Sequence, residues 1–165
     1  MASDQPRVEA QIMLAPWLYG FIPTNRKNIA PTTIKNSLSA LKKGEIVGIF
    51  PEGAATEQTI RPAKNGAAYL AMRTGAQILP MSIIGMDNIW DNWFKGIRPK
   101  IQINIGKTFL PAKLPKVRFE KNETIKISGE EIMCRIAALM PEEYHGIYTG
   151  DERIKNFRLK LPSKN

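Results

Sequence analysis

The chain has 165 residues, of which 43% are hydrophobic and 24% charged, and its formal net charge is +9. This composition fits one globular domain with a core and excludes a disordered chain, and the single cysteine, Cys134, excludes a disulfide framework and a cysteine-rich zinc site. The positive charge favours an anionic partner, but nucleic acid would rest on charge alone, because no zinc-finger, helix-turn-helix or RNP-type pattern is present.

The longest apolar run lies near the amino terminus, at residues 12–22 (IMLAPWLYGFI), and is interrupted by Pro16 and Gly20. It is shorter than the ~18 residues that a membrane-spanning helix needs. No basic segment precedes it, as one would in a signal peptide. We therefore expect a cytoplasmic protein that meets the membrane peripherally, on its inner face.

The next segments alternate between helical and strand-like patterns. Residues 31–44 predict a helix that Thr32 or Thr33 caps and Gly44 ends, with an apolar stripe at Ile34, Leu38 and Leu41. Residues 45–50 (EIVGIF) form a short apolar run before a breaker, which is typical of a strand buried on both faces.

The same alternation continues toward the middle of the chain. A second helix is predicted at 63–75, with small residues on one side and a stop at Gly75. A buried strand follows at 77–85, where Pro80 removes one hydrogen-bond donor and so indicates an edge or a bulge. Residues 100–106 (KIQINIG) alternate apolar and polar residues, which predicts a half-exposed strand.

The last third begins with a Pro- and Lys-rich connection at 107–127. Ser128 and Glu131 then form a potential capping box for a helix at 129–140, in which Cys134 is better explained as a buried thiol than as a nucleophile. Alternating strands and helices predict an α/β fold with a mostly parallel sheet flanked by helices. We expect one domain over residues 1–150 and a basic tail over 151–165.

The stretch Phe50-Pro51-Glu52-Gly53 follows the first predicted strand, where ligands bind in open parallel sheets. Pro51 fixes its own φ, and Gly53 permits a backbone turn that a side chain would block. The turn could bring backbone N–H groups and the Glu52 carboxylate to a bound polar group. A tight turn with Glu52 in solvent is the alternative, and the four residues alone favour it.

Arg61 and Lys64 precede the second predicted helix and could bind a phosphate. Cations at a helix N-terminus oppose its dipole, and an anion held between them and the helix would remove that conflict. Arg26 and Lys27 follow an apolar segment in the same way, although such pairs are usually just solvated surface.

Trp90, Trp93 and Phe94 cluster among charges between the two later predicted strands. Aromatic residues of this kind suit a bilayer interface, and a packed cluster beneath a long loop explains them equally well. Metal chemistry has little support, since His145 is the only histidine and has no partner at ligand spacing.

Taken in order, these segments resemble the glycerolipid acyltransferase family, in particular the 1-acylglycerol-3-phosphate acyltransferases. Residues 20–26 (GFIPTNR) are similar to the family's second sequence block, residues 50–53 match the start of the third fully, and residues 78–83 (ILPMSI) match the fourth. The basic, Gly- and Ala-rich segment at 61–71 and the Trp-containing segment at 88–109 also follow the family's order.

Two departures from the family are clear in the sequence. Phe-Pro-Glu-Gly continues here as Ala54-Ala55-Thr56, where the family usually has Thr-Arg-Ser, and Arg61 could supply the missing charge. The family's first block, His-x-x-x-x-Asp, is absent from this chain. Its histidine is taken as the general base, and His145 does not replace it because Asp151 lies one residue too far along.

The resemblance implies transfer of a fatty acyl group from acyl-CoA or acyl carrier protein to lysophosphatidic acid or a related lysophospholipid, at an anionic membrane surface. It implies no metal or other cofactor, because the thioester supplies the activation, and no nucleic-acid partner. The chain itself contains no catalytic residue of the family. The residues expected to bind substrate are Arg26, Phe50, Pro51, Glu52, Gly53, Arg61 and Lys64.

Three explanations fit the missing block: a truncated product, a pseudoenzyme that binds lipid without turnover, or completion by another subunit. The chain enters the matched segment without a linker, which favours truncation and an N-terminally incomplete core. A non-catalytic module that binds lipid or phosphate is the main alternative to an acyltransferase.

Overall fold

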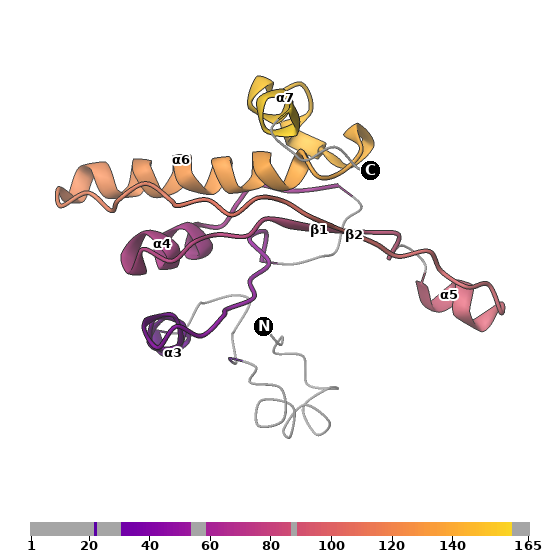
Figure 1. Cartoon of the computed structure of the whole chain (residues 1–165), viewed down its shortest axis with the longest axis horizontal. Coiled ribbons are helices and arrows are strands. Elements are labelled where there is room, and N and C mark those ends of the chain that lie inside the picture. The colour runs from indigo at the N-terminus through magenta and orange to yellow at the C-terminus, as the bar shows by residue number, and fades with distance from the viewer. Residues whose placement is uncertain (1–21, 23–30, 54–58, 87–88, 160–165) are drawn as a thin grey trace.

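The structure is a computed structural model that describes residues 22, 31–53, 59–86 and 89–159. Figure 1 shows the described elements in layers, with α6 lying between α7 on one side and the sheet and α4 on the other, and with α3 beyond α4. The helices and strands, numbered as in Figure 1, are α3 (Pro31–Lys42), α4 (Asn65–Thr74), β1 (Met81–Ile84), α5 (Ile89–Phe94), β2 (Gln102–Ile105), α6 (Arg118–Ala137) and α7 (Glu152–Leu159), with 3-10 turns at Glu142–Tyr144 and Gly146–Tyr148.

β1 and β2 form a two-stranded antiparallel sheet in which Met81 pairs with Ile105 and Ile83 with Ile103. An isolated bridge between Ile78 and Phe109 extends the pairing beyond Pro80. Proline has no N–H to donate, so the ladder breaks at this residue. The Pro80 carbonyl still accepts a hydrogen bond from the Gly106 N–H at 2.9 Å.

The predicted mostly parallel sheet is not formed by the residues that the structure describes, where the only sheet is this antiparallel pair. Residues 45–50 are not in a strand, and Ile46 is 99% exposed. An apolar run gives a segment the tendency to be extended, but a strand exists only when a neighbour accepts and donates its backbone hydrogen bonds. Within the described ranges no such neighbour lies beside residues 45–50.

The β1–β2 sheet carries polar side chains on its inner face and exposed apolar side chains on its outer face, which is the reverse of the usual arrangement. Its inner face carries Ser82, which is 3% exposed, and the half-buried Asn104. Both side chains donate hydrogen bonds to the Leu139 carbonyl oxygen, from Ser82 Oγ at 3.2 Å and from Asn104 Nδ2 at 2.8 Å. The apolar partners point outward and are exposed: Met81, Ile83, Ile103 and Ile105.

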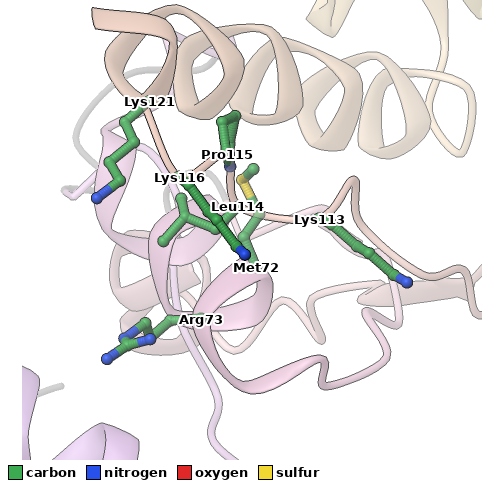
Figure 2. A pocket seen from close by; sticks show the side chains of 7 residues that line it. All are labelled: Met72, Arg73, Lys113, Leu114, Pro115, Lys116 and Lys121. Atoms are coloured by element: carbon green, nitrogen blue, oxygen red, sulfur yellow. The ribbon is translucent and has the colours of Figure 1, made fainter. Parts of the chain in front are cut away.

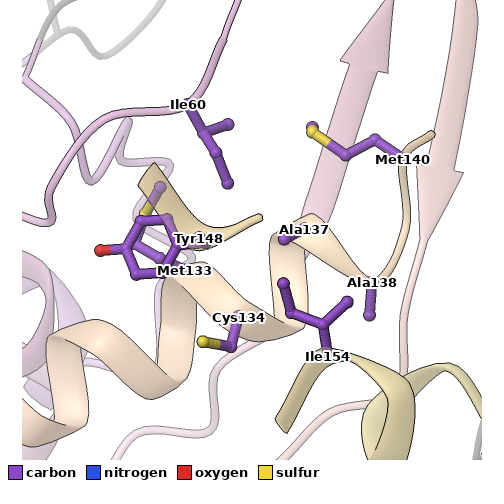
Figure 3. Packing of buried hydrophobic residues seen from close by; sticks show 8 residues of the cluster. All are labelled: Ile60, Met133, Cys134, Ala137, Ala138, Met140, Tyr148 and Ile154. Atoms are coloured by element: carbon purple, nitrogen blue, oxygen red, sulfur yellow. The ribbon is translucent and has the colours of Figure 1, made fainter. Parts of the chain in front are cut away.

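The main core cluster lies where α6 meets α7 and the segments around residues 60 and 148, as Figure 3 shows. Met133, Cys134 and Ala137 of α6 are fully buried there, and Ile154 of α7 packs against them. A second cluster joins α4 to α6 through Ala68, Met72, Ile125 and Ile132. Small side chains such as Ala68 let the two helices approach closely.

Helices α3 and α4 largely follow the sequence predictions. Gly44 and Gly75 follow their last residues with φ of 80° and 71°, which is the left-handed conformation that ends a helix. Thr33 lies inside α3 rather than capping it, and it is buried together with Ser37, whose hydroxyl donates to the Thr33 carbonyl at 2.9 Å. The predicted apolar stripe of α3 is only half-buried.

α6 begins much earlier than the capping box predicts. It starts at Arg118, so Ser128 lies inside the helix and is buried instead of capping it. The apolar spacing explains the difference, because Ile125 and Ile132 are two turns apart on the face that packs on α4. Tertiary burial thus extends a helix through a segment that its prolines and lysines had marked as a connection.

Residues 152–159, which the sequence placed in a basic tail, form α7 and pack on α6. A polar cluster joins the two helices. The Arg153 guanidinium donates hydrogen bonds to both carboxylate oxygens of Asp151, from Nη2 to Oδ2 at 2.6 Å and from Nε to Oδ1 at 3.0 Å. Its Nη1 lies 3.6 Å from Glu130 on α6. The Cys134 thiol donates to Asp151 at 3.6 Å, and burial raises the pKa of this thiol to about 12, which matches a buried, unreactive cysteine.

Replacing Asp151 should make the free energy of unfolding depend less on pH in the acidic range. The hydrogen bonds from Arg153 lower the pKa of Asp151 from 3.8 to about 2, so the stabilisation is complete above pH 3.8 and is lost as the pH falls toward about 2. Urea unfolding should show Asp151→Asn less stable than the parent near neutral pH, and this difference should shrink over that acidic range. The exposed Asp91→Asn is the control, and a difference that stays constant across the range would contradict the mechanism.

Candidate functional site

Residues 50–53 form a closed turn that is tied to the segment before α4. The Gly53 N–H donates to the Phe50 carbonyl at 3.0 Å, and Gly53 has a φ of 75°. The Lys64 N–H donates to the Pro51 carbonyl at 2.8 Å. The turn and the start of α4 therefore lie side by side, although residues 54–58 between them fall outside the described ranges.

The Glu52 carboxylate holds the backbone of the basic segment. Its Oε2 accepts a hydrogen bond from the Arg61 N–H at 2.9 Å, and the residue is half-buried. The alternative that left Glu52 in solvent is therefore wrong. A hydrogen bond to a charged acceptor stabilises by about 1.5–3 kcal/mol, so Glu52 positions Arg61 next to the turn.

Lys64 lies directly over the turn. A Cβ atom added to Gly53 would lie 2.7 Å from the Lys64 Cδ and 2.9 Å from its Nζ, so only a glycine leaves this space to the lysine side chain. Lys64 is also the N-cap residue of α4, where no side chain caps the helix and no acidic residue occupies the first turn. The ammonium group and the helix N-terminus give this corner positive charge, next to the Glu52 carboxylate.

The other predicted substrate-binding residues are placed less completely. Phe50, the first residue of the turn, is 59% exposed, and Pro51 is half-buried. Arg26 lies outside the described residues, as does the rest of the segment at 23–30. The structure thus brings together the turn, Arg61 and Lys64, and leaves the position of Arg26 a prediction.

The aromatic cluster lies on α5, at the end of the sheet away from α4 (Figure 1). Trp93 is 67% exposed and Phe94 87% exposed, so these two side chains do not form the packed cluster that was one explanation of them. The structure does not describe the side chain of Trp90. Two large exposed aromatic side chains on one short helix form an apolar surface feature of the kind that often marks an interaction site.

His145 occupies a structural position. It is 3% exposed, and its Nε2 lies 3.1 Å from the Met140 carbonyl oxygen and 3.4 Å from Arg158 Nη2. Asp151 is bound by Arg153, so it does not orient the imidazole. A buried ring between the end of α6 and α7 has no access to a substrate hydroxyl. Among the described residues, no three His, Cys, Asp or Glu side chains gather as a metal site would require.

A basic groove that the sequence reasoning missed lies at the other end of α4 (Figure 2). It has a volume of about 450 Å³ and is lined by Met72, Arg73, Lys113, Leu114, Pro115, Lys116 and Lys121. The lysines of the 107–127 connection were visible in the sequence as a charge-rich segment. What the sequence could not supply is their position next to Arg73, which lies forty residues earlier than Lys113.

Comparison with known proteins relates this chain to the acyltransferases. A model of the Acyltransferase family matches residues 9–84, a range that includes the turn, Arg61, Lys64 and β1. The chain is 34% identical, over 97 residues, to a 1-acyl-sn-glycerol-3-phosphate acyltransferase of Bacillus subtilis. Over this range the chain matches the Acyltransferase family, and it is similar to the 1-acyl-sn-glycerol-3-phosphate acyltransferases. The resemblance carried by the ordered sequence blocks is thereby confirmed.

Two further members of the glycerolipid acyltransferase family are similar to this chain. A chloroplastic 1-acyl-sn-glycerol-3-phosphate acyltransferase of Brassica napus is 29% identical over 83 residues, and one of Borreliella burgdorferi is 31% identical over 74 residues. The matches cover 55%, 48% and 43% of this chain and 47%, 24% and 30% of the Bacillus, Brassica and Borreliella proteins. The chain thus spans about half the length, or less, of these family members. No solved structure matches it.

The helices that the structure describes were also compared with the dimensions of a bilayer. None of them combines the length and the apolar character that crossing a membrane requires.

Proposed function

We propose that this chain is part of a 1-acylglycerol-3-phosphate acyltransferase, which moves a fatty acyl group from acyl-CoA or acyl carrier protein to lysophosphatidic acid or a related lysophospholipid. The match to the Acyltransferase family over residues 9–84 and the names of three relatives support this function. The observation that carries the proposal is the closed turn at residues 50–53, which Glu52 and Lys64 join to the basic start of α4.

The reaction needs a base and a place for the acceptor's phosphate. The hydroxyl oxygen of the lysophospholipid attacks the thioester carbonyl, a C–O bond forms as the C–S bond breaks, and the hydroxyl proton passes by way of the base to the departing thiolate. In the family the base is the histidine of His-x-x-x-x-Asp, which is absent from these 165 residues. No metal or other cofactor is required, because the thioester carbonyl is already activated.

The phosphate of the acceptor is proposed to bind at the positive corner made by the start of α4. Lys64 Nζ and the Arg61 guanidinium supply charge, and the uncapped N–H groups of α4 supply further donors. Arg26 would add a third cation. Phe50, the exposed first residue of the turn, is suited to contact the apolar part of the acceptor.

The reaction is proposed to take place at an anionic membrane surface on its cytoplasmic face, to which the protein binds peripherally. The net charge of +9 and the exposed Trp93 and Phe94 support this location. Basic residues near an anionic surface contribute about 1 kcal/mol each to binding.

A non-catalytic lipid-binding module is the second candidate function. It is favoured by one observation, namely that the only histidine is buried and bonded within the core. In this case the positive corner would bind the lysophospholipid phosphate without turnover.

The phosphate site can be tested by replacing both cations, as in Arg61→Ala/Lys64→Ala. Both residues hold the turn through their backbone N–H groups, so truncating the side chains leaves those hydrogen bonds in place. Binding of lysophosphatidic acid should weaken by roughly tenfold or more, since charge-assisted hydrogen bonds contribute about 1.5–3 kcal/mol and exposed ones less. Binding of monoacylglycerol, which lacks the phosphate, should change little.

The control for this experiment is Lys155→Ala, which removes an exposed cation on α7, on the far side of α6. Titration calorimetry of the chain with detergent-dispersed lipids gives both affinities. If the double variant lost affinity for both lipids equally, Arg61 and Lys64 would be structural residues and not a phosphate site.

A further inference from the structure

The basic groove joins two segments that are distant in the sequence. Arg73 and Met72 come from the last turn of α4, whereas the remaining lining residues come from the connection before α6 and from its first turn. In Figure 2 Leu114 and Met72 lie in the middle, with Lys121 and Arg73 on one side, Lys116 close to them and Lys113 extending away on the other side. The volume of about 450 Å³ lies within the range of sites for small molecules.

The groove is lined by four cations and by no acidic residue. None of these four cations forms an ion pair with a described carboxylate. Four like charges around one hollow repel one another, and a bound anion would remove this repulsion. The N-terminus of the 20-residue helix α6, which no side chain caps, also lies beside the groove, and its first turn carries one acidic residue, Glu120.

The groove is separate from the proposed acceptor site. Lys64 precedes α4 and Arg73 lies in its last turn. At ~1.5 Å per residue the two positions are roughly 13 Å apart along the helix axis, which is too far for one phosphate to contact both. The chain therefore has two positive regions, one at each end of α4.

We infer that the groove binds the phosphate groups of a ligand that carries more than one negative charge. Lysine and arginine bind phosphate by charge-assisted hydrogen bonds, and the apolar side chains of Leu114, Pro115 and Met72 accommodate the less polar part of the ligand. Two sources share this chemistry: the nucleotide portion of a phosphorylated thioester donor, and the headgroups of anionic lipids. This inference adds a second site to the proposed acceptor site; its donor source rests on the proposed function, whereas binding itself does not require turnover.

Binding of adenosine 3′,5′-bisphosphate and of vesicles tests the two sources separately. The chain is titrated with the bisphosphate, with adenosine as the uncharged probe, and in a second arm is mixed with phosphatidylcholine vesicles that contain or lack phosphatidic acid. The test variant is Lys113→Gln/Lys116→Gln, which removes two of the groove's four cations. The matched control is Lys107→Gln/Lys155→Gln, which changes the net charge equally at exposed positions outside the groove.

The test variant should lose about tenfold in affinity in at least one arm, while the matched control loses about twofold or less. A loss in the bisphosphate arm identifies the donor's nucleotide as the source, and a loss in the vesicle arm identifies the lipid headgroup. Equal behaviour of the two variants in both arms, or no binding of either probe by the parent chain, would overturn the inference.

Two further measurements show whether a loss of affinity comes from the groove itself. The thermal unfolding midpoint of the groove variant should equal that of the parent, because the replaced lysines are exposed. The acceptor-site variant Arg61→Ala/Lys64→Ala should keep its affinity for the bisphosphate. If that variant also lost this affinity, the two regions would not be independent and the groove would not be a separate site.

Discussion

The 165-residue chain alone is expected to release almost no free thiol from a long-chain acyl-CoA, with or without lysophosphatidic acid. General-base catalysis contributes typically ~10²–10⁴-fold to such reactions, and the family's base is not in this sequence. The turn at residues 50–53 and the basic start of α4 can bind and position an acceptor, but neither supplies a group that removes the hydroxyl proton. A thiol-reactive dye followed over time measures the release.

Joining a segment that carries His-x-x-x-x-Asp to the amino terminus should restore turnover by a comparable factor, about 10²–10⁴. Replacing the histidine of that segment by alanine should abolish the gain, whereas His145→Gln should leave it intact apart from any loss of stability. Vigorous, acceptor-dependent thiol release by the 165-residue chain itself would refute the assignment of the missing base. His145→Ala would then be the next variant to measure.

Gly146→Ala should be among the most destabilising single substitutions in the described part of the chain. Gly146 has a φ of 53°, and an added Cβ would overlap the Ile60 carbonyl oxygen and lie 3.2 Å from the Thr59 Cβ. The first contact is with backbone, so no change of rotamer relieves it, and the neighbouring hydrogen bond from the Ile60 N–H to Tyr144, at 2.9 Å, would be strained. We expect a loss of more than about 2 kcal/mol in the free energy of unfolding.

Gly150→Ala is the matched control for this substitution. Gly150 also has a positive φ, of 82°, but nothing lies within 4 Å of the added Cβ. It should therefore show only the backbone cost of about 1–2 kcal/mol. Urea unfolding of both variants isolates the steric term, and equal losses would mean that the segment at Thr59 and Ile60 moves aside freely.

The sequence predicted those elements whose signals are local. α3 and α4 end at glycines because the left-handed conformation after each helix favours that residue, and Pro80 marks a break in the sheet because it lacks an N–H. Residues 45–50 show the limit of this reasoning. Their apolar character was correctly recognised, but a strand depends on a partner elsewhere in the chain, and the described residues provide none.

The candidate site shows the same division between local and distant information. The turn at residues 50–53 could be predicted from Pro51 and Gly53, which restrict or free the backbone on their own. Two contacts could not be predicted in this way: the hydrogen bond from the Arg61 backbone to Glu52, and the position of Lys64 over Gly53. Both depend on the path by which the chain returns to the turn after residues 54–58, which the structure does not describe. The basic groove depends in the same way on the packing of α6 against α4.

The polar inner face of the β1–β2 sheet fixes the alignment of the two strands. Sliding β2 by one residue would turn Asn104 to the outer face and bring an isoleucine against the Leu139 carbonyl. That carbonyl would lose the shorter of its two side-chain donors, and leaving a buried polar group underbonded costs about 1–3 kcal/mol. If Asn104 were apolar like Ile103 and Ile105, a slip would exchange one apolar side chain for another, so the asparagine gives this short strand pair one preferred register and ties it to the end of α6.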